Sequence, residues 1–322
     1  MSKNAILSES GGGFMGIGPA RYMADLEHLM KSQIINCFSL LVGTSVGAID
    51  MALLACGFSA SDVLLFHYKH GKDIFGDKLW LYRLLKNGPK YSDKKINALL
   101  KEKLGNRTMS QTKVPLYITA YDARNRKLKV FGPKDTLVPV WYAVRCSMAA
   151  STYFSPMGGY SVDGGVFRLN SDGRYVDGGF TANDPLLCGI AAGFIDGYIN
   201  IKAEDLRLLN LVTSGETPEI STIKSGWNIL TTLKNVIIPA LTAGNSADVD
   251  FITKAWLQSM RQPKKNLFRV CPLTKDMQLD DVENSNCIES IWADQFRKDR
   301  YALGHFFNVS QKQQAEIANA QA

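Results

Sequence analysis

The hydrophobic pattern of the chain alternates between short strand-like segments and longer stretches with apolar residues at helical spacing. The strand-like segments, several of them continuous apolar runs, fall at residues 4–8, 37–42, 116–120, 127–131 and 207–212. The stretches at helical spacing fall at residues 16–31, 46–56, 141–150 and 185–193. This alternation predicts an α/β fold with a mostly parallel central sheet and helices on both faces. From about Ser225 onward the pattern predicts a helix-rich part.

Length and composition place the chain among globular proteins. Its 322 residues, 46% of them hydrophobic, suit one large α/β domain or two smaller ones. No window of 18 consecutive apolar residues occurs, and the first residues lack the apolar stretch of a signal peptide. We therefore expect a cytoplasmic protein that is peripheral to membranes, and export by a route that needs no signal peptide stays open.

The formal net charge of +7 arises in the first half of the chain. Residues 61–134 carry 17 basic and 6 acidic side chains, whereas residues 161–322 carry 16 basic and 19 acidic ones. This bias favours an anionic partner, either a membrane surface or a nucleic acid. A solvated lysine-rich surface explains the same bias equally well.

Cysteine and histidine give no sign of a metal site or a cofactor. None of the six cysteines forms a C-x-x-C pair, and most have apolar neighbours in the sequence, which is typical of reduced thiols in a core. The four histidines show no paired-ligand spacing. We expect no metal and no cofactor.

The sharpest local motif is G-x-S-x-G, formed by Gly43, Thr44, Ser45, Val46 and Gly47. It follows a predicted buried strand and precedes a predicted helix, which is the context that a nucleophile elbow requires. A sharp turn there exposes Ser45 Oγ, and the start of the helix offers unpaired N–H groups. A plain tight turn is the competing interpretation.

A glycine-rich loop connects the first predicted strand to the first predicted helix. Successive glycines expose backbone N–H groups that can bind an oxyanion; the loop residues concerned are Gly11, Gly12, Gly13, Phe14 and Gly16. The same letters fit a dinucleotide fingerprint, but residues 32–43 lack the acidic residue that this motif needs. No G-K-[S/T] follows, which excludes a P-loop.

The tetrapeptide Val-Asp-Gly-Gly occurs twice, with its aspartates at Asp163 and Asp177. Asp-Gly favours tight turns, and for Asp163 we prefer a hairpin turn without a chemical role. The second copy, with Gly178 and Gly179, continues through Asn183, Asp184 and Pro185 into an apolar helix.

Taken in order, these motifs resemble the patatin-like phospholipases. The glycine loop, the serine motif and the second Asp-Gly-Gly are joined by residues 143–156, similar to the helix and turn before the Asp-Gly-Gly, and by residues 211–215, where the family has a strand and a glycine-rich turn. The resemblance covers about residues 4–260, and we expect residues 1–260 to form the catalytic domain and residues 261–322 a C-terminal extension packed on it.

The resemblance implies a three-layer α/β/α fold and a lipid acyl hydrolase without a metal. It implies that Ser45 is the nucleophile, that Asp177 is its base, and that the glycine loop stabilises the oxyanion. One departure is Met15, where the family usually has a basic residue; it bears on oxyanion stabilisation or on head-group preference. The apolar stretch 225–260 is either core helices or a lip that admits acyl chains.

The expected substrate is a phospholipid or another acyl-ester lipid, reached by peripheral contact with an anionic membrane surface and without a nucleic-acid partner. Two alternatives stay open. The first is a soluble esterase with a Ser-His-Asp triad that uses His305 or another histidine. The second is a catalytically silent module that binds lipid or nucleic acid through the basic segment 61–134.

Overall fold

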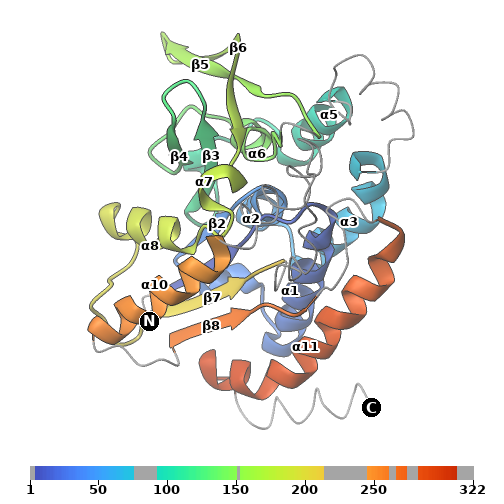
Figure 1. Ribbon diagram of the computed structural model, residues 1–322, viewed down its shortest axis with the longest axis vertical. Helices are drawn as coiled ribbons and strands as arrows, with labels where there is room; N and C mark the ends of the chain where they lie inside the picture. The colour runs from blue at the N-terminus through green and yellow to red at the C-terminus, as the bar shows by residue number, and fades with distance from the viewer. Residues whose placement is uncertain are drawn as a thin grey trace, which may run out of the picture.

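The computed structural model describes residues 4–75, 93–150, 153–213, 245–260, 266–273 and 282–309. Within these residues, the strands form one eight-stranded sheet in the order β5-β6-β3-β2-β1-β7-β8, with β4 paired to β3 (Figure 1). The strands are β1 (Ala5–Glu9), β2 (Leu40–Gly43), β3 (Leu116–Asp122), β4 (Lys127–Phe131), β5 (Met157–Asp163), β6 (Val166–Asp177), β7 (Arg207–Leu211) and β8 (Leu267–Val270).

The sheet is parallel at its centre and antiparallel at one end. β3, β2, β1, β7 and β8 run parallel to one another, whereas β4, β5 and β6 make antiparallel pairs. Every residue of β1 and β2 is buried, as expected for strands covered on both faces. The prediction of a mostly parallel sheet is confirmed.

Helices cover both faces, and neighbouring strand residues point to opposite layers. On β1, Leu7 packs in the cluster formed with α1, α2, α3, α5, α6 and α11, whereas Ile6 packs in the cluster formed with α8 and α10. Figure 1 shows α8 and α10 at the left and α1, α3 and α11 at the right. The α-helices are α1 (Ile17–Met30), α2 (Val46–Ala55), α3 (Ala60–Phe75), α5 (Asp93–Leu104), α6 (Val140–Ser147), α7 (Gly179–Ala182), α8 (Leu186–Ile195), α10 (Asn245–Ser259) and α11 (Ser285–Phe306).

Short 3-10 helices shift some predicted boundaries; they are η1 (Gly13–Gly16), η2 (Ile34–Cys37), η3 (Met109–Gln111) and η7 (Val282–Asn284). The apolar run 37–42 begins in η2, and its strand starts only at Leu40, where the parallel pairing with Ile6 of β1 begins. The β5–β6 hairpin was not predicted as strands, because glycines and polar residues interrupt its apolar positions.

The C-terminal residues belong to the same core as the first strands. β8 pairs in parallel with β7, and Trp292 and Phe296 of α11 are buried against Tyr22 of α1. The sheet thus continues past residue 260, and the domain division there stays a prediction. Of the predicted apolar lip, residues 225–244 lie outside the described residues. No helix in the described ranges has the length and apolar character needed to cross a membrane.

Candidate active site

Two strands converge along one edge of β3. Because β4 occupies the other edge, β2 and β6 both pair on the same side of β3. β2 runs parallel and its Gly43 lies opposite Ile118, while β6 runs antiparallel and its Asp177 lies opposite Ala120. The carboxyl ends of the two strands therefore meet. Ser45, just after β2, donates a hydrogen bond from Oγ to Asp177 Oδ2 over 2.9 Å.

Ser45 occupies a strained backbone conformation between β2 and α2. Its φ of 54° and ψ of −118° are rare for a residue with a side chain, and such strain is concentrated at functional sites. The flanking glycines are required by space. A Cβ on Gly43 would lie 2.3 Å from the Gly47 carbonyl oxygen, and a Cβ on Gly47 would lie 2.5 Å from that of Glu9. The local structure is the elbow that the G-x-S-x-G motif predicts.

Hydrogen bonds from neighbouring elements hold this elbow. The backbone N–H of Ser45 donates to Ser147 Oγ at the end of α6 over 2.8 Å. Thr44 Oγ1 donates to the carbonyl oxygen of Ala182 over 2.7 Å and contacts Thr119 Oγ1 at 2.5 Å. The Ser45 amide is therefore occupied. Val46, the first residue of α2, has no carbonyl four residues back within the helix to accept its N–H.

The glycine loop lies directly against the serine. A Cβ on Gly11 would lie 3.1 Å from Ser45 Cβ and 2.5 Å from Asn183 Oδ1, and a Cβ on Gly12 would lie 2.1 Å from Thr213 Oγ1. Only glycine fits at both positions. The Gly11 N–H donates to the Asn183 carbonyl oxygen over 2.9 Å. In this structure the Gly11 amide therefore holds the loop in place, and its role as an oxyanion donor stays a prediction.

The second half of the loop turns its side chains inward. Gly13 has a φ of 58°, which favours glycine, and Gly16 packs where a Cβ would lie 2.4 Å from Val46 Cγ2. Phe14 is 2% exposed and Met15 is 3% exposed, and both belong to the hydrophobic core. The residue that stands in place of the family's usual basic one is thus a core side chain.

Asp177 is a buried carboxyl group with two hydrogen-bond donors. Its Oδ1 accepts from the Gly179 N–H over 2.7 Å, and its Oδ2 accepts from Ser45. The side chain lies in a residue only 7% exposed, and burial raises the pKa of Asp177 to about 6, against the lowering effect of these hydrogen bonds and of Arg145. Its carboxylate is a stronger base than an exposed aspartate and is still mostly ionised at neutral pH.

The first Val-Asp-Gly-Gly copy has no part in this site. Asp163 ends β5, and Gly164 and Gly165 connect it to β6 with φ values of 55° and 80°. The three residues form the exposed turn of a hairpin. The predicted hairpin turn at Asp163 is confirmed, and the absence of a chemical role stays a prediction.

Within the described residues, no histidine forms a hydrogen bond with the serine or with the aspartate. His28 of α1 and His305 of α11 are exposed, and His70 of α3 is half-buried. His67 is buried and its Nε2 lies 2.8 Å from Asp50 Oδ1. Burial lowers the pKa of His67 to about 4, so it is neutral at pH 7. In the same residues, no three His, Cys, Asp or Glu side chains gather in a way that could hold a metal.

A buried ion pair that the sequence did not predict lies next to the segment that holds the glycine loop. Asp184 is 1% exposed, and its Oδ2 accepts hydrogen bonds from Asn210 Nδ2 and Arg269 Nη1, each at 2.9 Å. Asp184 follows Asn183, whose carbonyl oxygen holds Gly11. Asn210 of β7 and Arg269 of β8 thus hold the Asn183–Asp184 segment, and this segment in turn holds the glycine loop. No local sequence pattern could indicate a partner 85 positions away.

Comparison with known proteins connects these motifs to one family. The family model described as "Patatin-like phospholipase" matches residues 7–187. The chain is 28% identical over 212 residues to "Patatin-like protein 2" of Oryza sativa subsp. indica, a match that covers 58% of this chain and 52% of that protein. It is 27% identical over 243 residues to the "cGAMP-activated phospholipase" of Vibrio cholerae, which covers 67% of this chain and 66% of that protein.

The chain spans about half the length of the rice relative. Among solved structures, it is similar to VipD from Legionella pneumophila at 12% identity with a TM-score of 0.45, over 92% of this chain and 67% of that one. The family model alone covers more than half of this chain, from β1 through the serine elbow to the start of α8. The chain belongs to the patatin-like phospholipase family.

Proposed function

We propose that the protein is a lipid acyl hydrolase of the phospholipase A type, which cleaves carboxylic ester bonds through Ser45 and Asp177. One observation carries the proposal: the 2.9 Å hydrogen bond from Ser45 Oγ to Asp177 Oδ2, made at a strained elbow beside a glycine loop. A serine is a weak nucleophile until a base accepts its proton, and the hydrogen bond supplies that base.

The reaction proceeds in two steps. Ser45 Oγ attacks the ester carbonyl carbon while its proton passes to Asp177 Oδ2, and the carbonyl oxygen takes the negative charge. The donors proposed to stabilise this oxyanion are the N–H groups of the glycine loop at Gly12, Gly13 and Phe14, together with that of Val46 at the start of α2. The oxyanion collapses, the bond to the alcohol breaks, and the alcohol leaves with the proton from Asp177. Water, deprotonated by Asp177, then hydrolyses the acyl-enzyme to the free acid.

Two further features support an aspartate base over a histidine. Burial raises the pKa of Asp177 to about 6, nearer to the pH at which a general base works best. The two exposed histidines, His28 and His305, lie on α1 and α11, outside the contacts that surround Ser45. We therefore place the Ser-His-Asp esterase second.

The substrate class is proposed from the family. Several relatives are named phospholipase or patatin, and the first step needs only an activated ester carbonyl. Contact with a membrane surface is part of the proposal, because phospholipids reside in bilayers.

The test is covalent labelling combined with product analysis. A fluorophosphonate probe should modify Ser45, identified by peptide mapping, and the wild-type protein should release fatty acid from phosphatidylcholine vesicles. Labelling at another serine, or an unlabelled Ser45 in folded protein that hydrolyses no ester, would contradict the proposal.

A further inference from the structure

The β5–β6 hairpin forms an arm that extends past the rest of the sheet. Only Tyr175, Val176 and Asp177 of β6 pair with β3, and the rest of β6 pairs with β5 alone. β2 ends opposite Ile118, whereas β6 first meets β3 at Asp122, farther along in the same direction. The arm therefore rises from the carboxyl edge of the parallel strands, the edge at which Ser45 lies (Figure 1).

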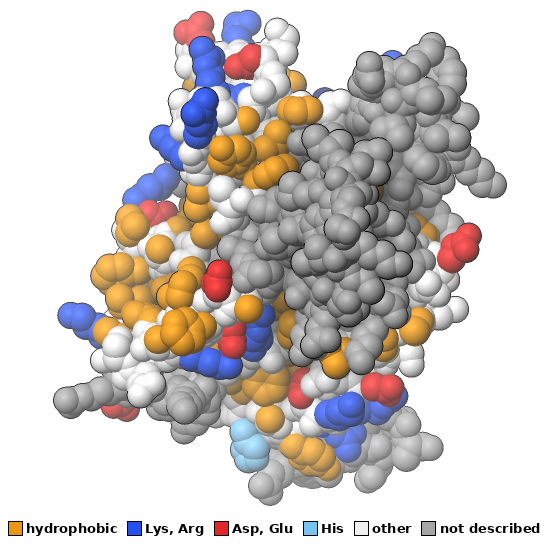
Figure 2. Space-filling view, viewed as in Figure 1, with side chains coloured by type: hydrophobic (Ala, Val, Ile, Leu, Met, Phe, Trp, Pro, Cys, Tyr) orange, Lys and Arg blue, Asp and Glu red, His pale blue; other side chains and the backbone are white. Residues whose placement is uncertain are grey.

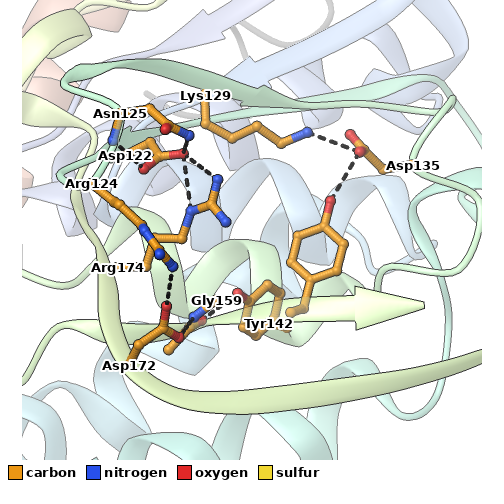
Figure 3. A network of polar contacts seen from close by, with 11 residues as sticks. Asp122, Arg124, Asn125, Lys129, Asp135, Tyr142, Gly159, Asp172 and Arg174 are labelled. Atoms are coloured by element: carbon orange, nitrogen blue, oxygen red, sulfur yellow. Dashed lines mark hydrogen bonds and ion pairs between the residues drawn. The ribbon is translucent and has the colours of Figure 1, made fainter. Parts of the chain in front are cut away.

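Polar contacts fix the root of this arm. Arg174 of β6 donates from Nε and Nη2 to Asp122 Oδ2 of β3, at 3.1 and 2.7 Å. Asp172 accepts from the N–H of Gly159 over 2.9 Å and lies 3.6 Å from Arg124. Figure 3 shows how these residues connect the arm to the β3–β4 turn. These contacts fix the orientation of the arm relative to the sheet and place the β3–β4 turn beside it.

One face of the arm is apolar and continues from the core into solvent. Tyr160 lies opposite Leu169, and Val162 lies opposite Phe167, so these four side chains share a face. Tyr160 and Phe167 stack at 5.5 Å on the side of the core, but Val162 and Leu169 are 45% and 50% exposed. Val166 precedes Phe167 in β6, so its side chain points to the opposite face, where it is 53% exposed. The tip of the arm thus presents exposed aliphatic side chains on both of its faces, beyond the part that packs against the core.

Cations surround these aliphatic residues. Arg126 in the β3–β4 turn, Lys127 at the start of β4 and Arg168 on the arm are exposed, and none of the three forms an ion pair with another described residue. Figure 2 shows Lys and Arg side chains along the upper left edge, where Figure 1 places this arm and turn. Asp163 at the tip and Asp172 nearer the root are the acidic residues of the arm, and Asp172 lies 3.6 Å from Arg124. The combination of aliphatic and cationic side chains is that of a surface for an anionic bilayer.

We infer that the β5–β6 arm is the element that places this protein on an anionic lipid surface. The inference rests on the proposed function and adds the docking element to it. Val162, Val166 and Leu169 enter the headgroup region while Arg126, Lys127 and Arg168 contact lipid phosphates. Because the arm rises from the same edge as Ser45, a bilayer that it contacts lies on the side of the active site.

The alternative of a protein strand added to β5 is disfavoured by the shape of that strand. The pairing of β5 with β6 has register shifts between Met157 and Gly158 and between Gly158 and Tyr160. Such irregularities twist an edge and interrupt its hydrogen-bond ladder, which blunts it against a further strand.

The experiment measures vesicle binding separately from catalysis. The full chain carrying Ser45→Ala is sedimented with vesicles of phosphatidylcholine and phosphatidylglycerol, and with vesicles of phosphatidylcholine alone. Adding Val162→Ser and Leu169→Ser should lower its affinity for the mixed vesicles by about tenfold, because two aliphatic side chains no longer leave water. Lys127→Gln with Arg168→Gln should lower the affinity by about tenfold or more for the mixed vesicles only.

The matched control is Leu65→Ser on α3, which removes an aliphatic side chain of the same 45% exposure within the basic segment 61–134. It should leave vesicle binding unchanged. In protein with Ser45 intact, the arm variants should keep the wild-type rate on a soluble short-chain ester, which also reports that they fold; Val162→Ser alone serves if the double variant does not.

The outcomes separate this inference from the proposed function. Unchanged vesicle binding in the arm variants, or loss of binding in Leu65→Ser alone, would overturn the inference while leaving ester hydrolysis intact. The protein could instead bind no vesicles and self-associate, and the arm variants could convert it to a monomer. That result would make a second copy of the chain, and not lipid, the partner of the arm. If the arm binds vesicles but the wild-type protein hydrolyses no ester, the proposed function is overturned and the inference about the arm still holds.

Discussion

At the scale of single residues, the sequence identified the two groups that the structure brings together, because each lies in a local motif. Ser45 needs a strand, a tight turn and a helix in sequence, and all three have local patterns. The supporting bonds were not predictable in this way. The Gly11 amide is engaged by Asn183, and the Ser45 amide by Ser147, through contacts between residues more than 100 positions apart.

The raised pKa of Asp177 predicts a pH dependence. Only the ionised carboxylate accepts the Ser45 proton, so kcat/KM on a short-chain ester should rise with pH, reach half its maximum at about pH 6 and level off above it. Steady-state rates between pH 4 and pH 9 in protein shown to be folded throughout would measure this. A profile that is flat across pH 5 to 7 would contradict an aspartate base with this pKa.

The same pKa predicts that Asp177 costs stability above pH 6. A carboxyl group whose pKa is higher in the folded than in the unfolded state keeps its proton longer when folded, so stability falls as pH rises between about pH 4 and pH 6. Asp177→Asn should therefore raise the free energy of unfolding at pH 8 by about 3 kcal/mol and have little effect at pH 4. Urea unfolding at both pH values tests this. An equal effect at the two pH values would show that burial of the charge is not the cause.

At the scale of elements, the predictable part is the part with a continuous apolar or helical pattern. The strands β1, β2, β3 and β7 and the helices α1, α2 and α8 all lie where the pattern predicts them, within a few residues. The β5–β6 arm was not predicted because most of its residues are exposed or only half-buried, and glycines and polar residues interrupt the few apolar positions that face the core. β8 was not predicted because it lacks the continuous apolar run that marks β2: Arg269 interrupts it, and only Val270 of its four residues is buried.

The ion pair between Arg269 of β8 and Asp184, in the loop after α7, predicts that replacing Arg269 alone strongly lowers the free energy of unfolding. Arg269→Met removes the cation that pairs with the buried carboxylate of Asp184, which should lower the free energy of unfolding by about 3–5 kcal/mol. Adding Asp184→Asn should recover much of this loss. Denaturant unfolding of the single and double variants gives the comparison.

The matched control is Lys134→Met, whose amine pairs with Asp196 at 2.6 Å but is 74% exposed. Because exposed ion pairs contribute little, this change should lower stability by less than about 1 kcal/mol. If Lys134→Met and Arg269→Met were equally destabilising, the buried position of Asp184 would not be the deciding factor.

At the scale of the whole molecule, the fold brings the residues of the candidate active site together where the ends of several strands meet. The first strand leads into the glycine loop, the second into Ser45, and the sixth ends at Asp177. β7 and β8 extend the sheet on the other side and hold the Asn183–Asp184 segment against the glycine loop. A shorter fragment of the chain would therefore not form this site, because its residues and their supports are spread from β1 to β8.

One set of rates tests the central claim most directly: hydrolysis of a short-chain ester and of phospholipid vesicles by wild type, Ser45→Ala, Asp177→Asn, the double variant and Asp163→Asn. We expect Ser45→Ala and Asp177→Asn each to lose about a thousandfold or more, the double variant to be little worse, and Asp163→Asn to match wild type. Circular dichroism confirms folding. An active, folded Asp177→Asn, together with an inactive, folded His305→Ala, would contradict the account and establish a histidine as the base.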